Sequence, residues 1–207
     1  MATAPGPVAH GAISPTRGWR LAVGLGSKRA LVVASYPMTT VIASALPEGA
    51  LLQAYASPAG YADCYVTEVA GTVSHEAFVR AFYTTPLIRV ERTILSWFAS
   101  RPSVDEDVDR LATGSSDEFA AWRVENRSED QVLLADYTGR TRSWLMVKPV
   151  QGAERPRTQL YFGSAVVPRI KASTGEMSMG LAFAALLGFH RLYSRSLLRA
   201  ACARIRK

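Results

Sequence analysis

Apolar segments with strand-like alternation dominate residues 117–170, and only polar turns separate them. The segments read EFAAWRVENR, QVLLADYTGRTRSWLMVKPV and TQLYFGSAVVPRI, and they are joined by SED and by QGAERPR. The first connection has the length of a hairpin turn, and the second is a longer polar loop. The pattern therefore predicts an antiparallel meander of at least three or four strands.

One further strand and a helix are predicted before the meander. Residues 61–71, YADCYVTEVAG, alternate in strand fashion, which places Tyr61 and Asp63 on the same face. Ser74 is an N-cap candidate for a helix over HEAFVRAFYTT. Pro86 should end this helix, because proline lacks an N–H and disfavours helical geometry in the residue before it.

Two more helices are predicted between Pro86 and the meander. Proline tolerates the first helical position, so a second helix can begin at Pro86. Its predicted apolar stripe is Leu87, Val90, Ile94, Trp97 and Phe98. A third helix follows Pro102, with Ser103 and Glu106 as a capping box and Gly114 just beyond its end.

The C-terminal segment SMGLAFAALLGFHRLYSRSLLRAACARIRK is predicted to form one long amphipathic helix. At 100° per residue, one face consists of Phe183, Leu186, His190, Tyr193, Leu197 and Ala201. A separate stripe consists of Arg191, Arg195 and Arg199. A sheet with one apolar face needs a cover, and a helix of this length can provide it. The order of elements predicts an α+β fold in which an antiparallel sheet wraps on the C-terminal helix, leaving a gap that can hold a ligand.

This order is similar to that of the helix-grip (START-like) fold, and five segments carry a closer resemblance. They are YADCYVTEV, AFYTTPLIRVERTIL, DYTGRTRSWLMV, LYFGSAVVP and LLGFHRLYSRSLL, and the likeness covers about residues 46–201. Together they resemble an uncharacterised bacterial family, a domain of unknown function with a START-like (SRPBCC, helix-grip) fold. That family is related to the domain attached to some atypical short-chain-dehydrogenase-like proteins. The resemblance implies the fold, but it brings no catalytic residues to carry over.

The N-terminal part is predicted to lie outside the domain. Residues 1–37 are rich in Gly and Pro, and we expect a disordered or misannotated extension, followed by a single START-like domain over residues 38–207. An export signal over KRALVVASYPMTTVIASA is the alternative, although polar residues interrupt its apolar run. The two cysteines are too few for a disulfide framework, and no stretch reaches the ~20 apolar residues of a membrane span. We therefore expect a cytoplasmic protein.

Charge is segregated along the chain. Residues 1–36 carry a net +4, residues 37–136 carry −8 and residues 137–207 carry +11. One interpretation is that acidic helices and the basic C-terminal helix neutralise each other after folding. The alternative is peripheral contact with an anionic membrane or an acidic partner. Nucleic acid is not expected as a partner, because no Lys/Arg-rich block is present.

Ligand-binding candidates lie on the C-terminal helix and on the strands it should cover. His190 is in the middle of the apolar helix face, where it is either a hydrogen-bonded core residue or a polar group of the cavity that can act as an acid or base. Asp63 and Asp136 need a partner if they are buried, and Arg140 or Arg142 is a candidate for that partner. The remaining candidates, which are alternatively plain core residues, are Tyr137, Trp144, Tyr161, Phe183 and Tyr193.

Strand parity separates two faces within DYTGRTRSWLMVKP. If residues 136–148 form one strand, the face with Arg140 and Arg142 also carries Trp144, which can stack under Arg142. The opposite face consists of Tyr137, Gly139, Thr141, Ser143, Leu145 and Val147. This second face is small and uncharged, so it is expected under the helix. The arginines are then either a structural strand end or an anion site at the cavity mouth.

No motif in the chain identifies a reaction. The three histidines have no metal-ligand spacing, Ser164 lacks the G-x-S-x-G elbow, and GLGSK lacks the spacing of a phosphate loop. No metal and no cofactor are therefore expected. The sequence favours a non-enzymatic protein that binds a hydrophobic small molecule or lipid between sheet and helix. The alternative is a cyclase- or hydratase-like enzyme using His190 with a tyrosine or Asp63.

Overall fold

The computed structural model describes residues 40–57, 60–90, 104–167, 169–170, 177–178 and 181–206, and it describes their side chains except at 169–170, 177–178 and 181–189. Contacts divide the chain into Met1–Tyr36 and Pro37–Lys207, and every described residue belongs to the second unit. Several predictions therefore lie outside the described residues. They concern the extension 1–37, the cap Ser103, and the side chains of Ile94, Trp97, Phe98, Phe183 and Leu186.

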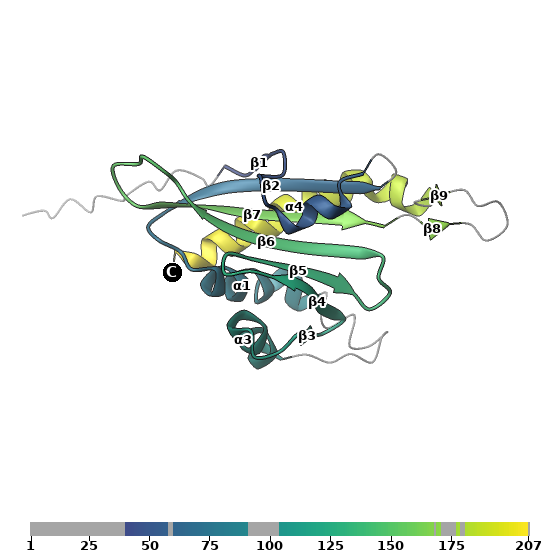
Figure 1. Cartoon of the computed structure of the whole chain (residues 1–207), viewed down its shortest axis with the longest axis horizontal. Helices are drawn as coiled ribbons and strands as arrows, with labels where there is room; N and C mark the ends of the chain where they lie inside the picture. Colours follow the sequence, from purple (N-terminus) through teal and green to yellow (C-terminus); the bar gives the residue numbers. More distant parts are fainter. Residues whose placement is uncertain are drawn as a thin grey trace, which may run out of the picture. The chain divides into compact units, whose positions relative to one another are not determined.

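Seven antiparallel strands form one sheet in the order β1-β2-β7-β6-β5-β4-β3 (Figure 1). The strands are β1 (Ile42–Ala43), β2 (Tyr61–Ala70), β3 (Glu118–Phe119), β4 (Trp122–Arg127), β5 (Gln131–Asp136), β6 (Thr141–Pro149) and β7 (Arg157–Val166). The predicted meander is confirmed as β4 to β7, and β2 pairs with β7 at its far side. Two short strands, β8 (Arg169–Ile170) and β9 (Met177–Ser178), pair separately.

A hairpin turn interrupts residues 136–148, for which the parity prediction assumed a single strand. The amide of Gly139 donates to the carbonyl of Asp136 at 2.9 Å, and Gly139 has a φ of 68°, which glycine adopts without steric cost. The Asp136 carboxylate caps the turn by accepting from the amides of Arg140 and Thr141 at 2.7 and 2.9 Å. The parity prediction was therefore wrong at Tyr137, which is exposed in the turn, but it is confirmed inside β6.

Helix α1 (His75–Tyr83) begins as predicted. The Oγ of Ser74 accepts a hydrogen bond from the amide of Ala77 at 3.1 Å, which satisfies one of the free N–H groups of the first turn. Phe78, Val79 and Phe82 are buried on one side of the helix, as expected. The cap therefore sets the start of the helix, and the apolar spacing sets its orientation.

The following two helices differ in detail from the prediction. Residues 86–90 are helical, but Ile88 is buried while Leu87 and Val90 are exposed, so the predicted stripe was wrong there. Helix α3 (Asp105–Thr113) has Val104 as its N-cap, and Oδ2 of Asp107 accepts from the Val104 amide at 2.8 Å. Its C-cap is Gly114, with a left-handed φ of 76°, as expected.

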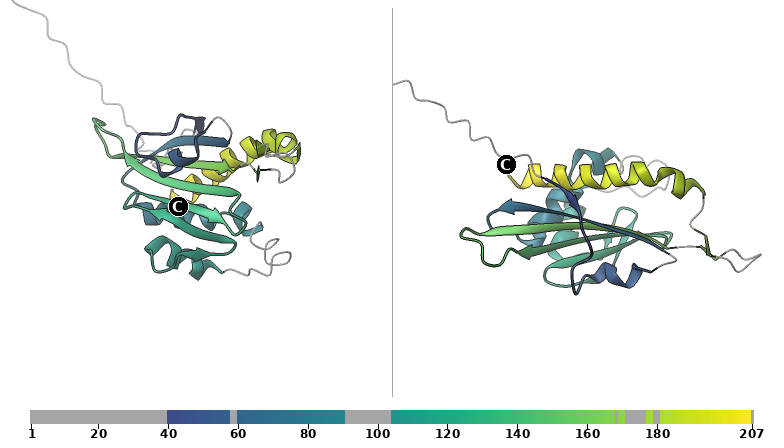
Figure 2. Two further views of the ribbon diagram at one scale, coloured as in Figure 1. Left: turned by 45° about the vertical axis from the view of Figure 1, so that its right-hand side comes forward. Right: turned by 90° about the horizontal axis from the view of Figure 1, so that it is seen from above.

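Helices lie on one face of the sheet and a short 3₁₀ helix, η1 (Leu51–Tyr55), lies on the other (Figure 2). The helical layer consists of α1, α3 and α4 (Leu181–Ile205), with α1 in contact with both of the others. The core under this layer includes Phe82, Leu145 and Phe162. The small face of β6, with Ser143, Leu145 and Val147, thus lies under the helices, as parity predicts.

The opposite face is closed by η1 and centred on Trp144. Trp144 is fully buried, and its Nε1 donates to Oε1 of Gln131 at 2.9 Å. Gln131 also accepts from the amide of Leu51 and donates to the carbonyl of Gly49, both at 3.0 Å. This single amide therefore connects the sheet to the segment that covers it.

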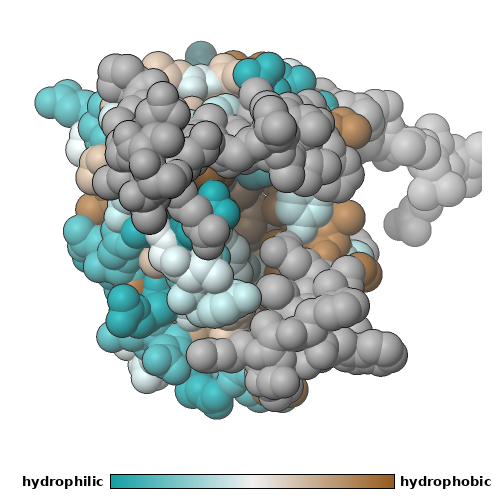
Figure 3. Space-filling view, turned by 90° about the vertical axis from the view of Figure 1, so that its right-hand side faces the viewer, coloured by the Kyte–Doolittle hydropathy of each residue, from teal (hydrophilic) through white to brown (hydrophobic). Residues whose placement is uncertain are grey.

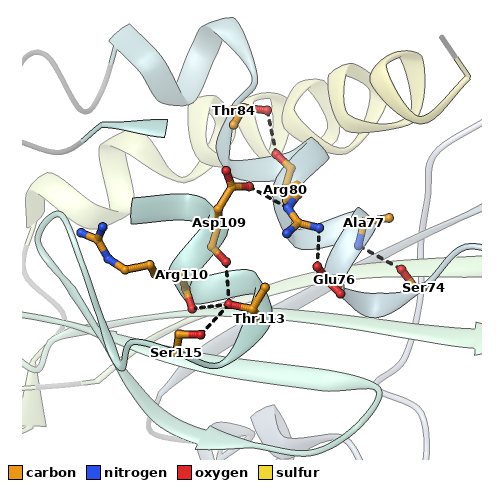
Figure 4. A network of polar contacts seen from close by, with 9 residues as sticks. All are labelled: Ser74, Glu76, Ala77, Arg80, Thr84, Asp109, Arg110, Thr113 and Ser115. Atoms are coloured by element: carbon orange, nitrogen blue, oxygen red, sulfur yellow. Dashed lines mark hydrogen bonds and ion pairs between the residues drawn. The ribbon is translucent and has the colours of Figure 1, made fainter. Parts of the chain in front are cut away.

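Ion pairs of the helical layer stay within the acidic region of the chain. Arg80 of α1 pairs with Glu76 and, at 2.7 Å, with Asp109 of α3 (Figure 4). In the part of the chain that the structure describes, no ion pair joins an arginine of α4 to these acidic helices. The described residues thus provide no ion pair in support of the interpretation that α4 and the acidic helices neutralise each other.

Helix α4 has the two faces predicted from its periodicity. Its buried residues include Leu197, Leu198, Ala201 and Cys202, and an exposed stripe consists of Arg191, Arg195 and Arg199. Arg195 reaches back over the ring of Tyr65, with Cζ 5.4 Å from the centroid. Within the described ranges, no helix has both the length and the apolar character needed to cross a membrane.

Candidate functional site

A cavity of about 210 Å³ lies between the sheet and helix α4. Its walls come from α1, β3, β4, β6, β7 and α4, and the larger apolar wall residues are Phe82, Ile88, Phe119, Phe162, Val166 and Leu197. Figure 3 looks onto the end of the sheet where β2 and β6 begin and β7 ends, and it shows a hollow with hydrophobic residues inside it. The cavity is smaller than the several hundred Å³ typical of drug-sized ligand sites.

A polar cluster joins the sheet to α4 at this cavity. Asp63 on β2 and Ser164 on β7 are directly opposite in the sheet register. Oδ1 of Asp63 accepts from the backbone amide of Ser164 at 3.1 Å and from its hydroxyl at 2.7 Å. The same Oγ lies 2.7 Å from Nε2 of His190, which α4 brings over the two strands. Ser164 and His190 form part of the cavity wall, whereas Asp63 supports them from behind.

The directions of these hydrogen bonds follow from the groups involved. A carboxylate has no hydrogen to donate, so the single hydroxyl hydrogen of Ser164 points to Asp63. Its lone pair then faces His190, and Nε2 must carry the hydrogen of that bond. In a Ser-His-Asp triad the imidazole instead accepts from the serine. Ser164 is therefore held by His190 rather than activated by it, and Nδ1 is the ring nitrogen left for proton exchange.

Tyr61 completes the cluster on the sheet. Its hydroxyl donates to Oδ2 of Asp63 at 3.0 Å, and its ring contacts the His190 ring edge-on with centroids 5.9 Å apart. Burial and the negative charge of Asp63 raise the pKa of Tyr61 to about 12. The phenol therefore stays protonated at neutral pH and acts as a hydrogen-bond donor to Asp63. Oδ2 of Asp63 also lies 3.6 Å from Nε2 of His190, so both carboxylate oxygens have partners.

Two further hydroxyl groups of the cavity wall are paired, and one is not. The hydroxyl of Tyr83 lies 2.8 Å from Oγ of Ser143, and both residues are buried. Ser194 on α4 is fully buried, and its Oγ has no hydrogen-bond partner within the described part of the chain. Ser194 follows His190 by four residues and therefore lies on the same helix face.

The candidate residues named from the sequence separate into two groups. His190 and Tyr193 line the cavity. Trp144 and Tyr161 pack in the core under η1, on the other face of the sheet. Tyr137 and Arg140 lie in or next to the β5–β6 turn and do not line the cavity, and the side chain of Phe183 is outside the described residues. The structure thus brings together the two candidates on α4 and, from the sheet, Arg142.

Arg142 contributes to the wall, but its charge is directed elsewhere. Its Nε lies 2.7 Å from Oε2 of Glu125, and its guanidinium lies 4.5 Å from the ring centroid of Tyr55 in η1. The aromatic partner of Arg142 is therefore Tyr55 and not Trp144 as expected. This placement does not support the interpretation that Arg142 forms an anion site.

The expected pairing of buried aspartates with arginine side chains was also wrong. Asp63 is bound by Ser164, Tyr61 and His190, and Asp136 by backbone amides and the hydroxyl of Thr138. The partnership of Asp63 with Ser164 depends on which strand pairs with β2, a contact between residues 101 positions apart. Ser194 carried a usable sequence signal, because its spacing from His190 places both on one helix face.

Metal binding finds no support in the described residues, which contain no group of three or more His, Cys, Asp or Glu side chains able to hold an ion. Comparisons with known proteins give no further guide, since no family model, no curated protein and no solved structure matches the chain significantly. The chemistry of the site therefore rests on its own residues.

Proposed function

We propose that the protein binds a small, largely apolar molecule in the cavity between the sheet and α4. The observation that carries this proposal is an apolar cavity of about 210 Å³ with a hydrogen-bonded polar cluster in its wall. We also propose a helix-grip (START-like) fold, because an antiparallel sheet with a long C-terminal helix across one face is compatible with it. In such a fold the gap between the two layers is the natural ligand site.

The volume of the cavity limits the size of the ligand. An apolar cavity of ~150 Å³ in a protein core accepts benzene, which has six heavy atoms. A cavity of about 210 Å³ is therefore suited to a single-ring molecule or a short aliphatic chain. A whole phospholipid is far larger, so the size favours a small molecule over an intact lipid.

Toluene is a suitable first probe, and ligand-observed NMR or calorimetry measures its binding. Val166, which ends β7 and lines the cavity, provides a blocking variant, Val166→Phe. We expect this variant to weaken toluene binding at least tenfold, because the added ring occupies the cavity. Val167→Phe is the matched control, since Val167 is the next residue and does not line the cavity. Absence of toluene binding to the unaltered protein contradicts the proposal, as does an equal effect of both variants.

An acid–base activity in the same cavity is less well supported. The cyclase- or hydratase-like alternative requires His190 to exchange a proton with the ligand. Nε2 already donates to Ser164 and both carboxylate oxygens of Asp63 have partners, which leaves only Nδ1 of His190 for proton exchange. The cluster therefore resembles a structural brace more than a set of groups awaiting a substrate.

The exposed face of α4 favours a second candidate function, peripheral binding to an anionic membrane. Arg191, Arg195 and Arg199 form an exposed stripe along it, and α4 contains no acidic residue. Such a basic face is attracted to anionic lipid, and salt screens this attraction. Co-sedimentation with phosphatidylserine vesicles should fall for Arg195→Gln/Arg199→Gln, but not for Arg123→Gln on β4. Equal binding to neutral and anionic vesicles contradicts this candidate.

A further inference from the structure

We propose that the ligand carries a neutral hydroxyl or carbonyl group that hydrogen-bonds to Oγ of Ser194, beside His190. This inference rests on the proposed function, because it names the chemical class of the molecule that the cavity binds. It concerns one atom of the cavity wall and the charges around it.

The hydroxyl of Ser194 is in an unusual state for a helix. Serine side chains inside helices commonly donate to the carbonyl four residues earlier, as Ser196 does to Leu192 at 2.9 Å in the same helix. Ser194 has no such bond and no other partner among the described residues, although it is fully buried. A buried hydroxyl without a partner is costly, so such groups are normally satisfied by water or by a ligand.

The position of Ser194 in the cavity wall favours a role in ligand binding over a purely structural role in the core. It forms part of the cavity wall between His190 and Leu197, one turn from each. The other buried hydroxyls of that wall are satisfied, since Ser143 pairs with Tyr83 and Ser164 pairs with Asp63. Ser194 is thus a buried hydroxyl of the wall that a bound molecule can satisfy.

The surrounding charges favour a neutral group over an acidic one. The Asp63 carboxylate lies directly behind Ser164 and His190, and its side chain is 11% exposed. A carboxylate ligand at Ser194 would lose its water close to this negative charge. Arg142, an arginine among the wall residues, is paired with Glu125.

The same charges do not favour an amine. Asp63 does not line the cavity, and its two oxygens already accept from Ser164 and Tyr61. An ammonium group would therefore be buried among apolar residues without a free carboxylate. A hydroxyl or carbonyl has the smallest desolvation cost of the polar groups that can satisfy Ser194.

Four single-ring probes of similar size test the inference: toluene, benzyl alcohol, benzoate and benzylamine. In the unaltered protein, we expect benzoate to bind at least tenfold more weakly than benzyl alcohol. In Ser194→Ala, benzyl alcohol should lose about fivefold in affinity, the value of one neutral hydrogen bond, whereas toluene should not. Ser194→Thr keeps the hydroxyl and should restore most of the affinity for benzyl alcohol.

Ser196→Ala is the matched control, because Ser196 lies on the same helix, does not line the cavity and bonds to its own backbone. The melting temperature of ligand-free Ser194→Ala should equal or exceed that of the unaltered protein, since an unsatisfied hydroxyl is removed. If toluene and benzyl alcohol both bind and Ser194→Ala changes them equally, the inference is wrong while the proposed function stands. Tighter binding of benzoate or benzylamine than of benzyl alcohol also overturns it. If no probe binds at all, the proposed function itself fails.

Discussion

Oγ of Ser164 on β7 lies 2.7 Å from Nε2 of His190 on α4, so a hydrogen bond connects the sheet to the helix that covers it. The bond exists because the register of β2 and β7 places Asp63 opposite Ser164 and orients the serine hydroxyl. Its hydrogen belongs to His190, which makes the contact a brace for the cavity wall. The strength of this brace can be measured directly.

Ser164→Ala should destabilise the protein by about 1–3 kcal/mol. The change removes the hydrogen-bond acceptor for Nε2 of His190 and one of the donors to Asp63. Urea unfolding measures the difference in free energy. Ser196→Ala is the control and should change the stability by less than about 0.5 kcal/mol. A loss of equal size in both variants would show that the contact with His190 contributes nothing specific.

His75 should make the stability depend on pH between about 4 and 6.5. Burial and the charge of Arg127 lower the pKa of His75 to about 4, with Asp130 opposing the shift. The unfolded chain binds the proton near pH 6.5 and the folded chain only near pH 4, so stability is lost as the pH falls through this window. The difference corresponds to about 3 kcal/mol.

The measurement compares the unaltered protein with His75→Gln, whose side chain does not titrate. Urea unfolding from pH 8 to pH 4 should show a stability difference between the two proteins that shrinks as the pH falls. The carboxylates titrate equally in both proteins, so the comparison isolates the contribution of His75 to the pH dependence of stability. Parallel pH profiles would mean that His75 is not held neutral in the folded state.

Gly163→Ala should destabilise the protein by about 1–3 kcal/mol and disturb the polar cluster. A Cβ at this position would lie 2.7 Å from Cδ2 of Leu52, 2.8 Å from the carbonyl oxygen of Asp63 and 3.0 Å from Cε3 of Trp144. Backbone on the neighbouring strand cannot yield as a flexible side chain can. Thermal unfolding and the ¹⁵N–¹H shifts of Ser164 report the two effects, and unchanged shifts would contradict the second.

Gln131→Ala should cost about 3–5 kcal/mol, because it leaves three polar groups around η1 without partners. They are Nε1 of Trp144, the amide of Leu51 and the carbonyl of Gly49. Hydrogen exchange of residues 49–55 should rise in parallel, since their attachment to the sheet is lost. Gln159→Ala is the control, because the part-buried amide of Gln159 bonds to the side chains of Glu68 and Tyr161. It should lower the free energy of unfolding far less than Gln131→Ala.

Local patterns were sufficient for most of the longer elements and their faces, but not for the buried side of residues 86–90. The spacing of apolar residues identified β2, the meander, α1 and both faces of α4, because side-chain direction repeats every 2 or 3.6 residues whatever the rest of the fold does. The same rule failed across Asp136–Arg140, where the turn residues interrupt the period. Asp136 followed three residues later by Gly139 was the overlooked signal of that turn.

The sequence by itself determined an α+β chain with an antiparallel sheet, a covering C-terminal helix, and Leu145 rather than Trp144 on the face that the helices cover. Only the tertiary structure decided that Asp63 meets Ser164 and His190, and that Arg142 turns to Tyr55 and Glu125. Those contacts join residues far apart in the chain, and they depend on strand order and register. Local periodicity carries no information about either, because a side chain's face is set by its neighbours in sequence and its partner by the packing of the whole fold.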